Sequence, residues 1–271
     1  MNTKKFGEYF DRNRLSWNRK TVEHFKSDFY NVGKFKESKS SLNSIELEEL
    51  GDVEGKSILH LQCHFGLDTL SWANLGADVT GVDFSEESIK KARELNSELG
   101  LNAEFICCNI YDLREHLSNK FDIVFTSYGV IGWLPDLGEW AGLINDFLKP
   151  GGTFYMVEFH PFIWIYDSEF DRIEYSYFID QPIIESYTGS YADDKSGNQY
   201  TDYGWNHSIS EILNSLLEQK FKILHFNEFP YSVYNCFRDM EEIESGKWVI
   251  KKLSNKIPHM ISVKASKKNN L

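Results

Sequence analysis

Five short apolar segments alternate with helical segments between Lys56 and Pro161, and this alternation constrains the fold more than any other feature. The apolar segments are KSILHLQC, ADVTGVDFS, NAEFICCNI, KFDIVFTSYG and TFYMVEFHPF. The intervening segments GLDTLSWANLG, SEESIKKARELNSELG and DLGEWAGLINDFLKPGG predict helices, and LREHL predicts a shorter one. Such a pattern predicts an α/β protein with a doubly wound, mostly parallel sheet and right-handed crossovers.

The alternation resumes after residue 205 with one helix and two strands. SISEILNSLLEQK predicts the helix, and FKILHFNEF and HMISVKASK predict the strands. The segment between these strands lacks the pattern of a full crossover helix. Parallel strands need such a crossover, so we expect the last two strands to pair antiparallel at the edge of the sheet.

Two segments fall outside the alternation. Residues 1–50 predict an N-terminal helical cap, in which Leu15, Val22, Phe25 and Phe29 recur near helical spacing and SSLNSIELEEL forms a serine-capped second helix. Residues 163–205, inside a main domain of residues 51–271, are rich in tyrosine and tryptophan. We expect this insertion to cover the substrate at the functional edge of the sheet. A second small core is the alternative.

Charge and composition exclude several classes of protein. The net charge of −12 disfavours binding to nucleic-acid phosphates, which needs cationic side chains. No apolar run approaches the roughly 20 residues of a membrane span, and the first residues have no apolar core of a secretory signal. Four cysteines without CxxC spacing predict free thiols in a cytoplasmic protein.

The carboxyl ends of the predicted strands gather the candidate ligand-binding residues. Ligands of open α/β sheets bind at this edge. The turn ILHLQCHFG follows the first strand, and Asp83 ends the second, where a carboxylate can accept hydrogen bonds from ribose hydroxyls. Asn109 and Ile110 end the third strand, where they can touch a base. Gln62 and His64 would obstruct a dinucleotide pyrophosphate, which needs glycines for close approach, so an adenosine cofactor without phosphates fits better.

The run from Ile58 to Pro161 resembles the class I S-adenosylmethionine-dependent methyltransferases. Within that family, LHLQCHFGLDTLSWANLGADVTGVDFS, FTSYGVIGWLPD and LKPGGTFYMVEFHPF are similar to an uncharacterised bacterial branch that acts on small molecules. The resemblance implies a seven-stranded sheet with an antiparallel last strand. It also implies S-adenosyl-L-methionine as the methyl donor, S-adenosyl-L-homocysteine as the product and a small-molecule acceptor.

The resemblance also implies a set of cofactor-binding residues. The glycine-rich first motif falls on His60 to Gly66, the ribose-binding acid on Asp83, and the motif after the fourth strand on Ser127 to Gly129. The complete expected set is Gln62, Cys63, His64, Gly66, Asp83, Phe84, Asn109, Ile110, Ser127, Tyr128 and Gly129. The usual acid of the first motif is replaced by His60. The Gln62 amide or the Tyr128 carbonyl could take over its contact with the methionine ammonium group.

Candidate catalytic and substrate-lining residues come from the same edge and from the cap. His160, just past the fifth strand, and Tyr128, beside the expected methyl position, are the catalytic candidates, and a capping role for His160 is equally compatible with the sequence. The expected substrate-lining residues are Trp17, His24, Tyr30, Trp133 and Trp205. We expect no metal, because His60, Cys63 and His64 lack a spaced fourth ligand. We also expect no DNA substrate, because TSYG replaces the [DN]PP[YFW] motif of DNA adenine and cytosine N-methyltransferases.

Two other functions share these features. One is a protein that binds S-adenosylmethionine or S-adenosylhomocysteine without catalysis, which the altered loop and the lack of an obvious base would allow. The other is a nicotinamide-dependent oxidoreductase, which shares the fold and Asp83 but needs the missing glycines. Cofactor-dependent stabilisation separates the two cofactor classes directly.

Overall fold

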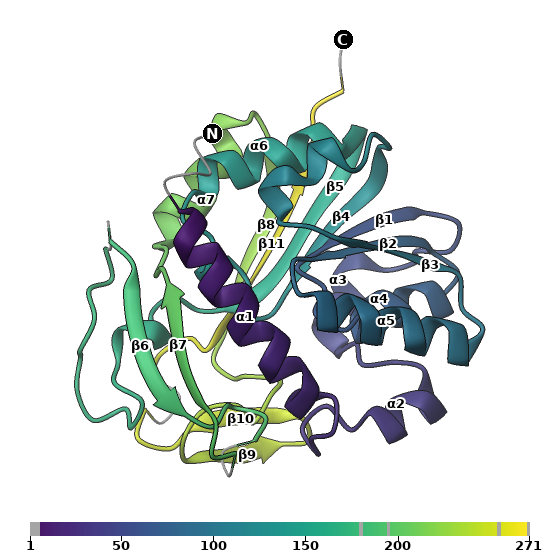
Figure 1. Ribbon diagram of the computed structural model, residues 1–271. Coiled ribbons are helices and arrows are strands. Elements are labelled where there is room, and N and C mark those ends of the chain that lie inside the picture. The colour runs from purple at the N-terminus through teal and green to yellow at the C-terminus, as the bar shows by residue number, and fades with distance from the viewer. Residues whose placement is uncertain (1–5, 179–180, 194–195, 254–255, 270–271) are drawn as a thin grey trace.

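A computed structural model describes residues 6–178, 181–193, 196–253 and 256–269 of the chain. Its centre is a seven-stranded sheet in the order β3-β2-β1-β4-β5-β11-β8 (Figure 1). The strands are β1 (Ser57–Leu61), β2 (Asp78–Asp83), β3 (Ala103–Cys107), β4 (Phe121–Ser127), β5 (Leu148–Phe159), β8 (Lys222–Phe229) and β11 (Met260–Ser266). The first five are parallel, and β11 runs antiparallel to both β5 and β8. This confirms the predicted sheet and its antiparallel edge.

Helices cover both faces of the sheet because each strand alternates apolar side chains between two cores. Leu59 and Leu61 of β1 pack with α6 (Leu137–Phe147) and α7 (Ile209–Glu218). Ile58, the residue before Leu59, packs with α3 (Ser44–Leu50) and α4 (Leu67–Asn74) on the opposite face. The α5 helix (Glu86–Leu99) continues that second layer, and the Ser85 side chain caps it as predicted. The short 3-10 helices η2 (Ile110–Glu115), η3 (Ile131–Trp133) and η4 (Ile163–Ile165) follow β3, β4 and β5.

The N-terminal segment forms α1 (Gly7–His24), α2 (Val32–Ser38) and α3, but the predicted apolar stripe of α1 is wrong. Leu15 and Val22 are 58% and 43% exposed, and the helix ends before Phe25. The buried residues of α1 are polar: Asn13, Ser16, Lys20, Thr21 and His24. The helix packs on polar partners rather than on an apolar core, so hydrophobic spacing could not identify its inner face. The N-cap of α3 is Asn43, not a serine.

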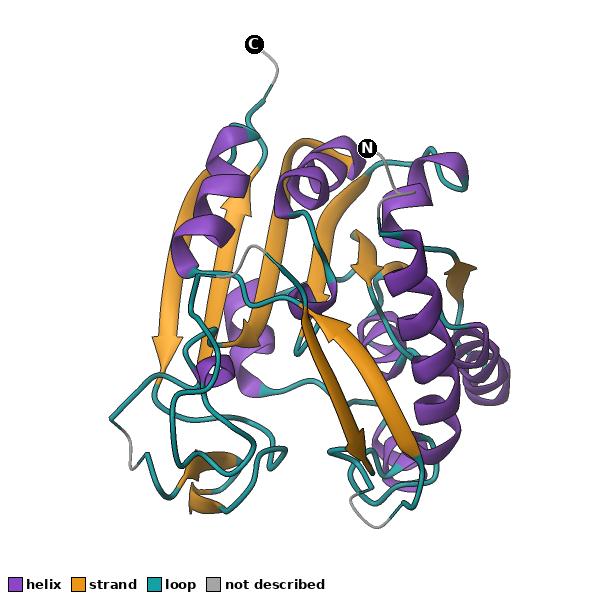
Figure 2. Ribbon diagram, turned by 60° about the vertical axis from the view of Figure 1, so that its left-hand side comes forward, coloured by secondary structure: helices purple, strands orange, loops and turns teal. Residues whose placement is uncertain are grey.

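The insertion supplies a hairpin of β6 (Ile183–Thr188) and β7 (Gln199–Gly204), and β7 lies against α1 (Figures 1 and 2). A second hairpin, β9 (Met240–Glu244) with β10 (Lys247–Ile250), interrupts the connection from β8 to β11 and was not predicted. Ile163, Phe170 and Ile250 form a small core between the two regions. Part of the insertion therefore builds the second core that the sequence allowed. No helix within the described ranges is long and apolar enough to cross a membrane.

Candidate functional site

The turn after β1 keeps a left-handed backbone at three alternating positions. The φ angles are 54° at Gln62, 50° at His64 and 79° at Gly66. Only the last must be glycine, because a Cβ at Gly66 would lie 2.8 Å from the Phe105 ring and 3.1 Å from Ala92. Left-handed geometry costs a non-glycine residue roughly 1–2 kcal/mol, and histidine tolerates it better than most. The turn therefore keeps left-handed geometry at Gln62 and His64 without glycine.

The Gln62 side chain offsets part of that cost by bridging two loops. Its Nε2 donates a hydrogen bond to the carbonyl oxygen of Val130, at 2.9 Å, in the segment after β4. Its Oε1 is buried and accepts no hydrogen bond from any described residue. A buried acceptor without a donor is costly, so Oε1 is suited to receive an N–H group from a ligand.

The His64 side chain belongs to a hydrogen-bonded chain that joins α1, α5 and the insertion. The Thr21 hydroxyl donates to the Trp17 carbonyl, so it accepts from Ser88. The Ser88 oxygen then accepts from His64 Nδ1 at 3.0 Å, and His64 Nε2 accepts from His24 Nδ1 at 3.3 Å. The last hydrogen bond of this series is donated by the Ser190 hydroxyl to His24 Nε2.

Both histidines of this chain are held neutral. Burial lowers the pKa of His24 to about 3; the charge of Lys20 reinforces this shift and that of Glu23 opposes it. Burial also lowers the pKa of His64. A neutral imidazole has one donor and one acceptor, as this direction requires. His24, expected to line a substrate, therefore has both ring nitrogens engaged, one with His64 of the turn after β1 and the other with Ser190.

Asp83 lies beneath the same loop. One carboxylate oxygen accepts the His64 backbone N–H and the other accepts that of Ser85, each at 2.9 Å. Burial raises the pKa of Asp83 to about 6, although these hydrogen bonds partly oppose the shift. Each carboxylate oxygen has a further lone pair, so Asp83 can still accept hydrogen bonds from a ligand.

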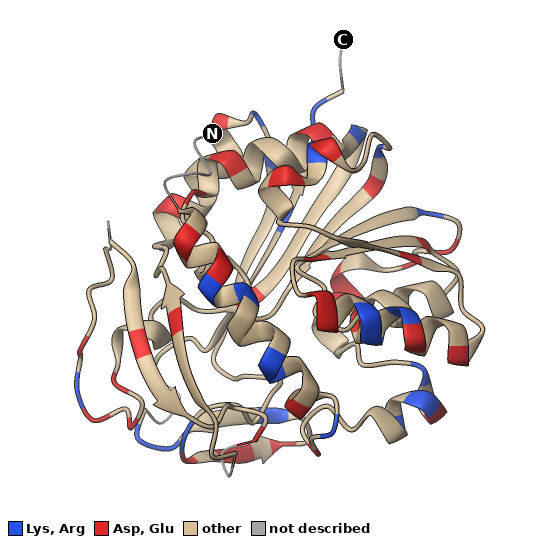
Figure 3. Cartoon of the chain, viewed as in Figure 1, with Lys and Arg blue, Asp and Glu red and all other residues tan. Residues whose placement is uncertain are grey.

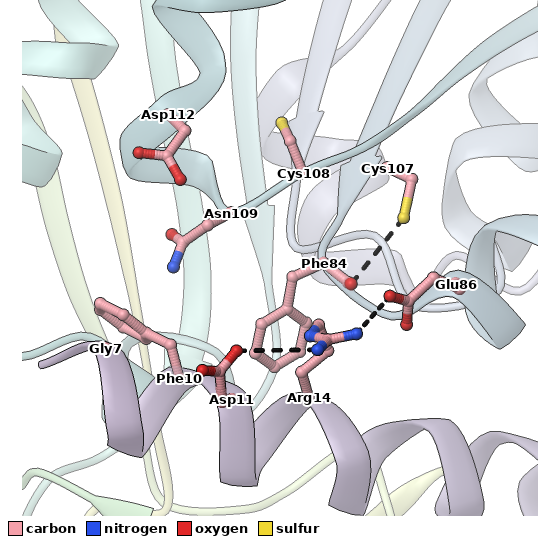
Figure 4. A pocket seen from close by; sticks show the side chains of 10 residues that line it. All are labelled: Gly7, Phe10, Asp11, Arg14, Phe84, Glu86, Cys107, Cys108, Asn109 and Asp112. Carbon is pink, nitrogen blue, oxygen red and sulfur yellow. Dashed lines mark hydrogen bonds and ion pairs between the residues drawn. The ribbon is translucent and has the colours of Figure 1, made fainter. Parts of the chain in front are cut away.

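A cavity of about 450 Å³ lies between α1 and the ends of β2 and β3 (Figure 4). Phe84 and Asn109 are among its described lining residues, whereas Asp83 is not and Ile110 is buried in the core. Gly7, Phe10, Asp11, Arg14, Glu86, Cys107, Cys108 and Asp112 complete the lining. Arg14 forms ion pairs with Asp11 and Glu86.

The charges around this cavity distinguish the candidate cofactors. Three carboxylates and one already paired arginine are among its described lining residues. Such a lining repels a pyrophosphate and suits a cofactor that carries positive charge. Acidic and basic side chains also intermingle along α1 and α5, as Figure 3 shows, without a broad basic surface there. The described residues therefore fit S-adenosylmethionine better than a dinucleotide.

The segment after β4 is held by Glu158, a residue that the sequence analysis missed. Its carboxylate accepts hydrogen bonds from four backbone N–H groups, those of Gly129, Val130, Ile131 and Phe159. Glu158 is buried in β5. A single charged residue within the apolar run YMVEF was the available signal, because a buried charge needs partners.

The Tyr128 side chain contacts a second carboxylate that was not predicted from the sequence, that of Glu46. Its hydroxyl donates to Glu46 of α3 at 2.6 Å, and Glu46 also accepts the Asn43 backbone N–H at 2.7 Å. Burial, reinforced by the charge of Asp68, raises the pKa of Glu46 to about 7. A carboxylate that titrates near neutral pH is suited to accept a proton. The pattern NSIE indicated only a helix cap, so this pairing could not be predicted from the sequence.

The structure places the other predicted residues as follows. Trp17 and Trp133 meet edge to face, with ring centres 5.3 Å apart, and Trp17 also contacts His64. Tyr30 joins this group through His24 and His64. Trp205 packs instead against Phe6 and Tyr9 at the start of α1. The loop also includes Cys63, which is buried.

His160 has partners for both ring nitrogens. Nε2 lies 3.0 Å from Glu228, and Nδ1 accepts the Phe162 backbone N–H, also at 3.0 Å. This arrangement favours the capping role over proton transfer. Among the described residues, no group of three or more His, Cys, Asp or Glu side chains is arranged to hold a metal ion.

The strand order, the antiparallel last strand and the acid that ends β2 are those of the class I methyltransferase fold. Residues 58–152 match the family model described as a methyltransferase domain.

Relatives with curated descriptions are similar over the same region. The ubiquinone biosynthesis O-methyltransferase of Idiomarina loihiensis is 33% identical over 121 residues, 42% of this chain and 49% of that protein. Its counterpart in Bordetella avium is 30% identical over 116 residues, 41% of this chain and 48% of that protein. The chain thus spans about half the length of the curated relatives it matches.

Solved structures share the fold across more of the chain. An S-adenosylmethionine-dependent methyltransferase from Clostridium acetobutylicum superposes with a TM-score of 0.55 at 15% identity, covering 98% of this chain and 99% of that one. The geranyl diphosphate C-methyltransferase of Streptomyces coelicolor, solved with S-adenosyl-L-homocysteine, gives a TM-score of 0.55 at 13% identity, covering 82% and 74%. At such identities the similarity shows the fold alone.

Proposed function

We propose that this protein transfers a methyl group from S-adenosylmethionine to a small-molecule acceptor. The observation that carries the proposal is the loop after β1, which keeps three left-handed positions above the Asp83 carboxylate despite losing two glycines. Asp83 binds the ribose, Phe84 and Asn109 border the adenine, and Gln62, Ser127 and Gly129 border the methionine part. The four cysteines are unpaired, which supports a reducing compartment such as the cytoplasm.

We further propose that the acceptor is a hydroxyl compound. The matched relatives are named as O-methyltransferases, and Tyr128 with Glu46 provides a route for the hydroxyl proton. As the acceptor oxygen bonds to the methyl carbon, the carbon–sulfur bond of the sulfonium breaks. The acceptor proton moves to the Tyr128 oxygen, and the proton of Tyr128 moves to Glu46. Trp17 and Trp133 are the aromatic residues proposed to border the acceptor.

Cofactor binding provides the first test. S-Adenosylhomocysteine at 100 times its dissociation constant should raise the free energy of unfolding by about 2.7 kcal/mol, seen as a higher thermal midpoint. The Asp83→Ala variant should bind it roughly 10- to 100-fold more weakly, because hydrogen bonds to a charged group contribute about 1.5–3 kcal/mol. Calorimetry measures both affinities, and Asp78→Asn at the exposed start of β2 is the control.

Other outcomes of this test favour the alternative functions. Stabilisation by NAD or NADP alone would contradict the methyltransferase proposal and support an oxidoreductase. Binding of S-adenosylmethionine without turnover across a panel of phenols, enols and alcohols would favour the non-catalytic binding protein. An unchanged affinity in Asp83→Ala would refute the ribose assignment.

The proposed proton acceptor can be tested without knowing the acceptor. Folding raises the pKa of Glu46 from 4.5 to about 7, so its contribution is favourable below pH 4.5 and is lost as the pH rises through 7. Relative to Glu46→Gln, which never ionises, the wild type should lose up to about 3 kcal/mol of unfolding free energy between pH 4.5 and 8. Urea unfolding at each pH measures this, and parallel curves would contradict a raised pKa.

A further inference from the structure

His60 occupies the position of the acid in the first methyltransferase motif, and it cannot replace that acid. Burial lowers its pKa to about 3, so the ring is neutral. Its Nδ1 lies 2.8 Å from the Thr69 hydroxyl, and its Nε2 lies 3.2 Å from that of Ser127. Both nitrogens are engaged, and neither offers a negative charge to a cofactor ammonium group.

Asp68, at the start of α4, is the carboxylate connected to this histidine. It accepts a hydrogen bond from the Ser127 hydroxyl at 3.0 Å and from the Ser41 hydroxyl at 2.6 Å. Because Ser127 gives its proton to Asp68, the Ser127 oxygen accepts from His60 Nε2. His60 Nδ1 then accepts from Thr69. Each hydrogen bond in the chain from Thr69 through His60 and Ser127 is therefore directed towards Asp68.

The surroundings of Asp68 favour a positively charged ligand. Burial raises its pKa, opposed only by the two serine hydrogen bonds, and no Lys or Arg of the described chain is among the causes of its shift. Its position in the first turn of α4 supports negative charge through the helix dipole. Asp68 as a residue is half-buried, and its carboxylate forms no ion pair with a Lys or Arg of the described residues.

A further atom at the same edge, Gln62 Oε1, matches this charge, because it is buried and no described residue donates a hydrogen bond to it. Ser127 ends β4, where the methionine part of the cofactor is proposed to lie. An α-ammonium group has three N–H donors. It can satisfy a carboxylate and an amide oxygen at once.

We propose that Asp68 binds the α-ammonium group of S-adenosylmethionine and takes the place of the first-motif acid. Gln62 Oε1 accepts a second N–H, and His60 and Ser127 act as positioning residues for the carboxylate. The inference rests on the proposed cofactor. It assigns the role to a helical residue outside the turn, which explains how the turn can carry histidine in the usual acidic position.

The test compares two ligands that differ only in the ammonium group. The probes are S-adenosylhomocysteine and its deaminated analogue, 5′-deoxy-5′-(3-carboxypropylthio)adenosine, which keeps the carboxylate. In the wild type, S-adenosylhomocysteine should bind at least about tenfold more tightly. In Asp68→Asn its affinity should fall roughly 10- to 100-fold, as expected for loss of a charged hydrogen bond. The affinity of the analogue should change less than about threefold.

The controls separate this inference from the proposed function. If the wild type binds neither probe, the proposed cofactor itself is wrong. If the wild type binds S-adenosylhomocysteine and Asp68→Asn weakens both probes equally or neither, only the role of Asp68 is refuted. Asp68→Ser, a second neutral residue suited to a first helical turn, covers the case in which the asparagine variant fails to fold. Asp78→Asn should leave both affinities unchanged.

Discussion

Replacing Glu158 with alanine should lower the free energy of unfolding by about 3–5 kcal/mol, because four backbone N–H groups would lose their common acceptor. Three of these groups belong to consecutive residues after β4. Among the described residues, these three N–H groups have no acceptor other than Glu158. Hydrogen bonds from several N–H groups offset the cost of burying the Glu158 charge. In the alanine variant, the same N–H groups would be buried without an acceptor.

Urea unfolding followed by tryptophan fluorescence measures the loss. Glu158→Gln keeps the shape and one good acceptor but turns an NH2 group towards backbone donors, so it should lie between the wild type and Glu158→Ala. Glu104→Ala, an exposed glutamate on β3, should stay within about 0.5 kcal/mol of the wild type. A Glu158→Ala variant that unfolds within 1 kcal/mol of the wild type would show that water replaces the carboxylate.

The sheet could be predicted because each of its strands is specified by residues that are consecutive in the sequence. Each strand from β1 to β5 is a short apolar run, and helix caps such as Ser85 and Gly100 mark where the next element begins or ends. The edge residues followed from the same pattern, since a residue that ends a parallel strand must lie at the carboxyl edge. Asp83 was placed on that basis, and it lies at the end of β2. Phe84, which lines the cavity, was expected from the family resemblance.

The hairpin β9–β10 could not be predicted because its first strand has almost no buried side. Four of the five residues of β9 are exposed, and three of them are glutamates. Without an apolar alternation there is no period to detect. The buried face of α1 could not be predicted for a related reason. Its buried residues are polar, and they contact polar partners from distant parts of the sequence.

Three carboxylates with proposed roles in the site were also not predicted from the sequence. Glu46, Asp68 and Glu158 are joined to residues at least 27 positions away, namely Tyr128, Ser41 and Gly129–Ile131. Sequence spacing records neighbours within one element, not side chains brought together by crossovers. Each carboxylate also had a local explanation, as a helix cap, a helical first turn or a strand residue.

Lys20 and Asp202 form the most deeply buried ion pair of the described chain, and they fasten α1 to β7. The Lys20 side chain is 3% exposed, and its ammonium lies 4.9–5.3 Å from the ring centres of Trp17, Trp133, Tyr187 and Tyr200. Asp202 also accepts the hydroxyl protons of Ser16 and Tyr187. Burial lowers the pKa of Lys20, while the carboxylate of Asp202 opposes that shift.

Removing only the lysine charge should be far more damaging than removing both charges. Lys20→Met leaves Asp202 buried without a cation and should cost about 3–5 kcal/mol, whereas Lys20→Met combined with Asp202→Leu should recover most of that loss. Denaturant unfolding of the wild type, both single variants and the double variant measures the coupling free energy. Hydrogen exchange of the α1 amides shows whether the helix detaches before the sheet unfolds.

Lys34→Met, at an exposed position of α2, provides the matched control and should change stability by less than about 0.5 kcal/mol. Additive losses in the double variant would mean that the aromatic rings, rather than Asp202, hold the ammonium. If the α1 amides exchange early in Lys20→Met while the sheet amides stay protected, this ion pair is the contact that holds α1 against the rest of the protein. Trp17 and His24 of that helix contact His64 in the turn after β1, and Asn18 contacts Glu86 of α5. If this turn binds the cofactor as proposed, the same variant should also weaken binding of S-adenosylhomocysteine.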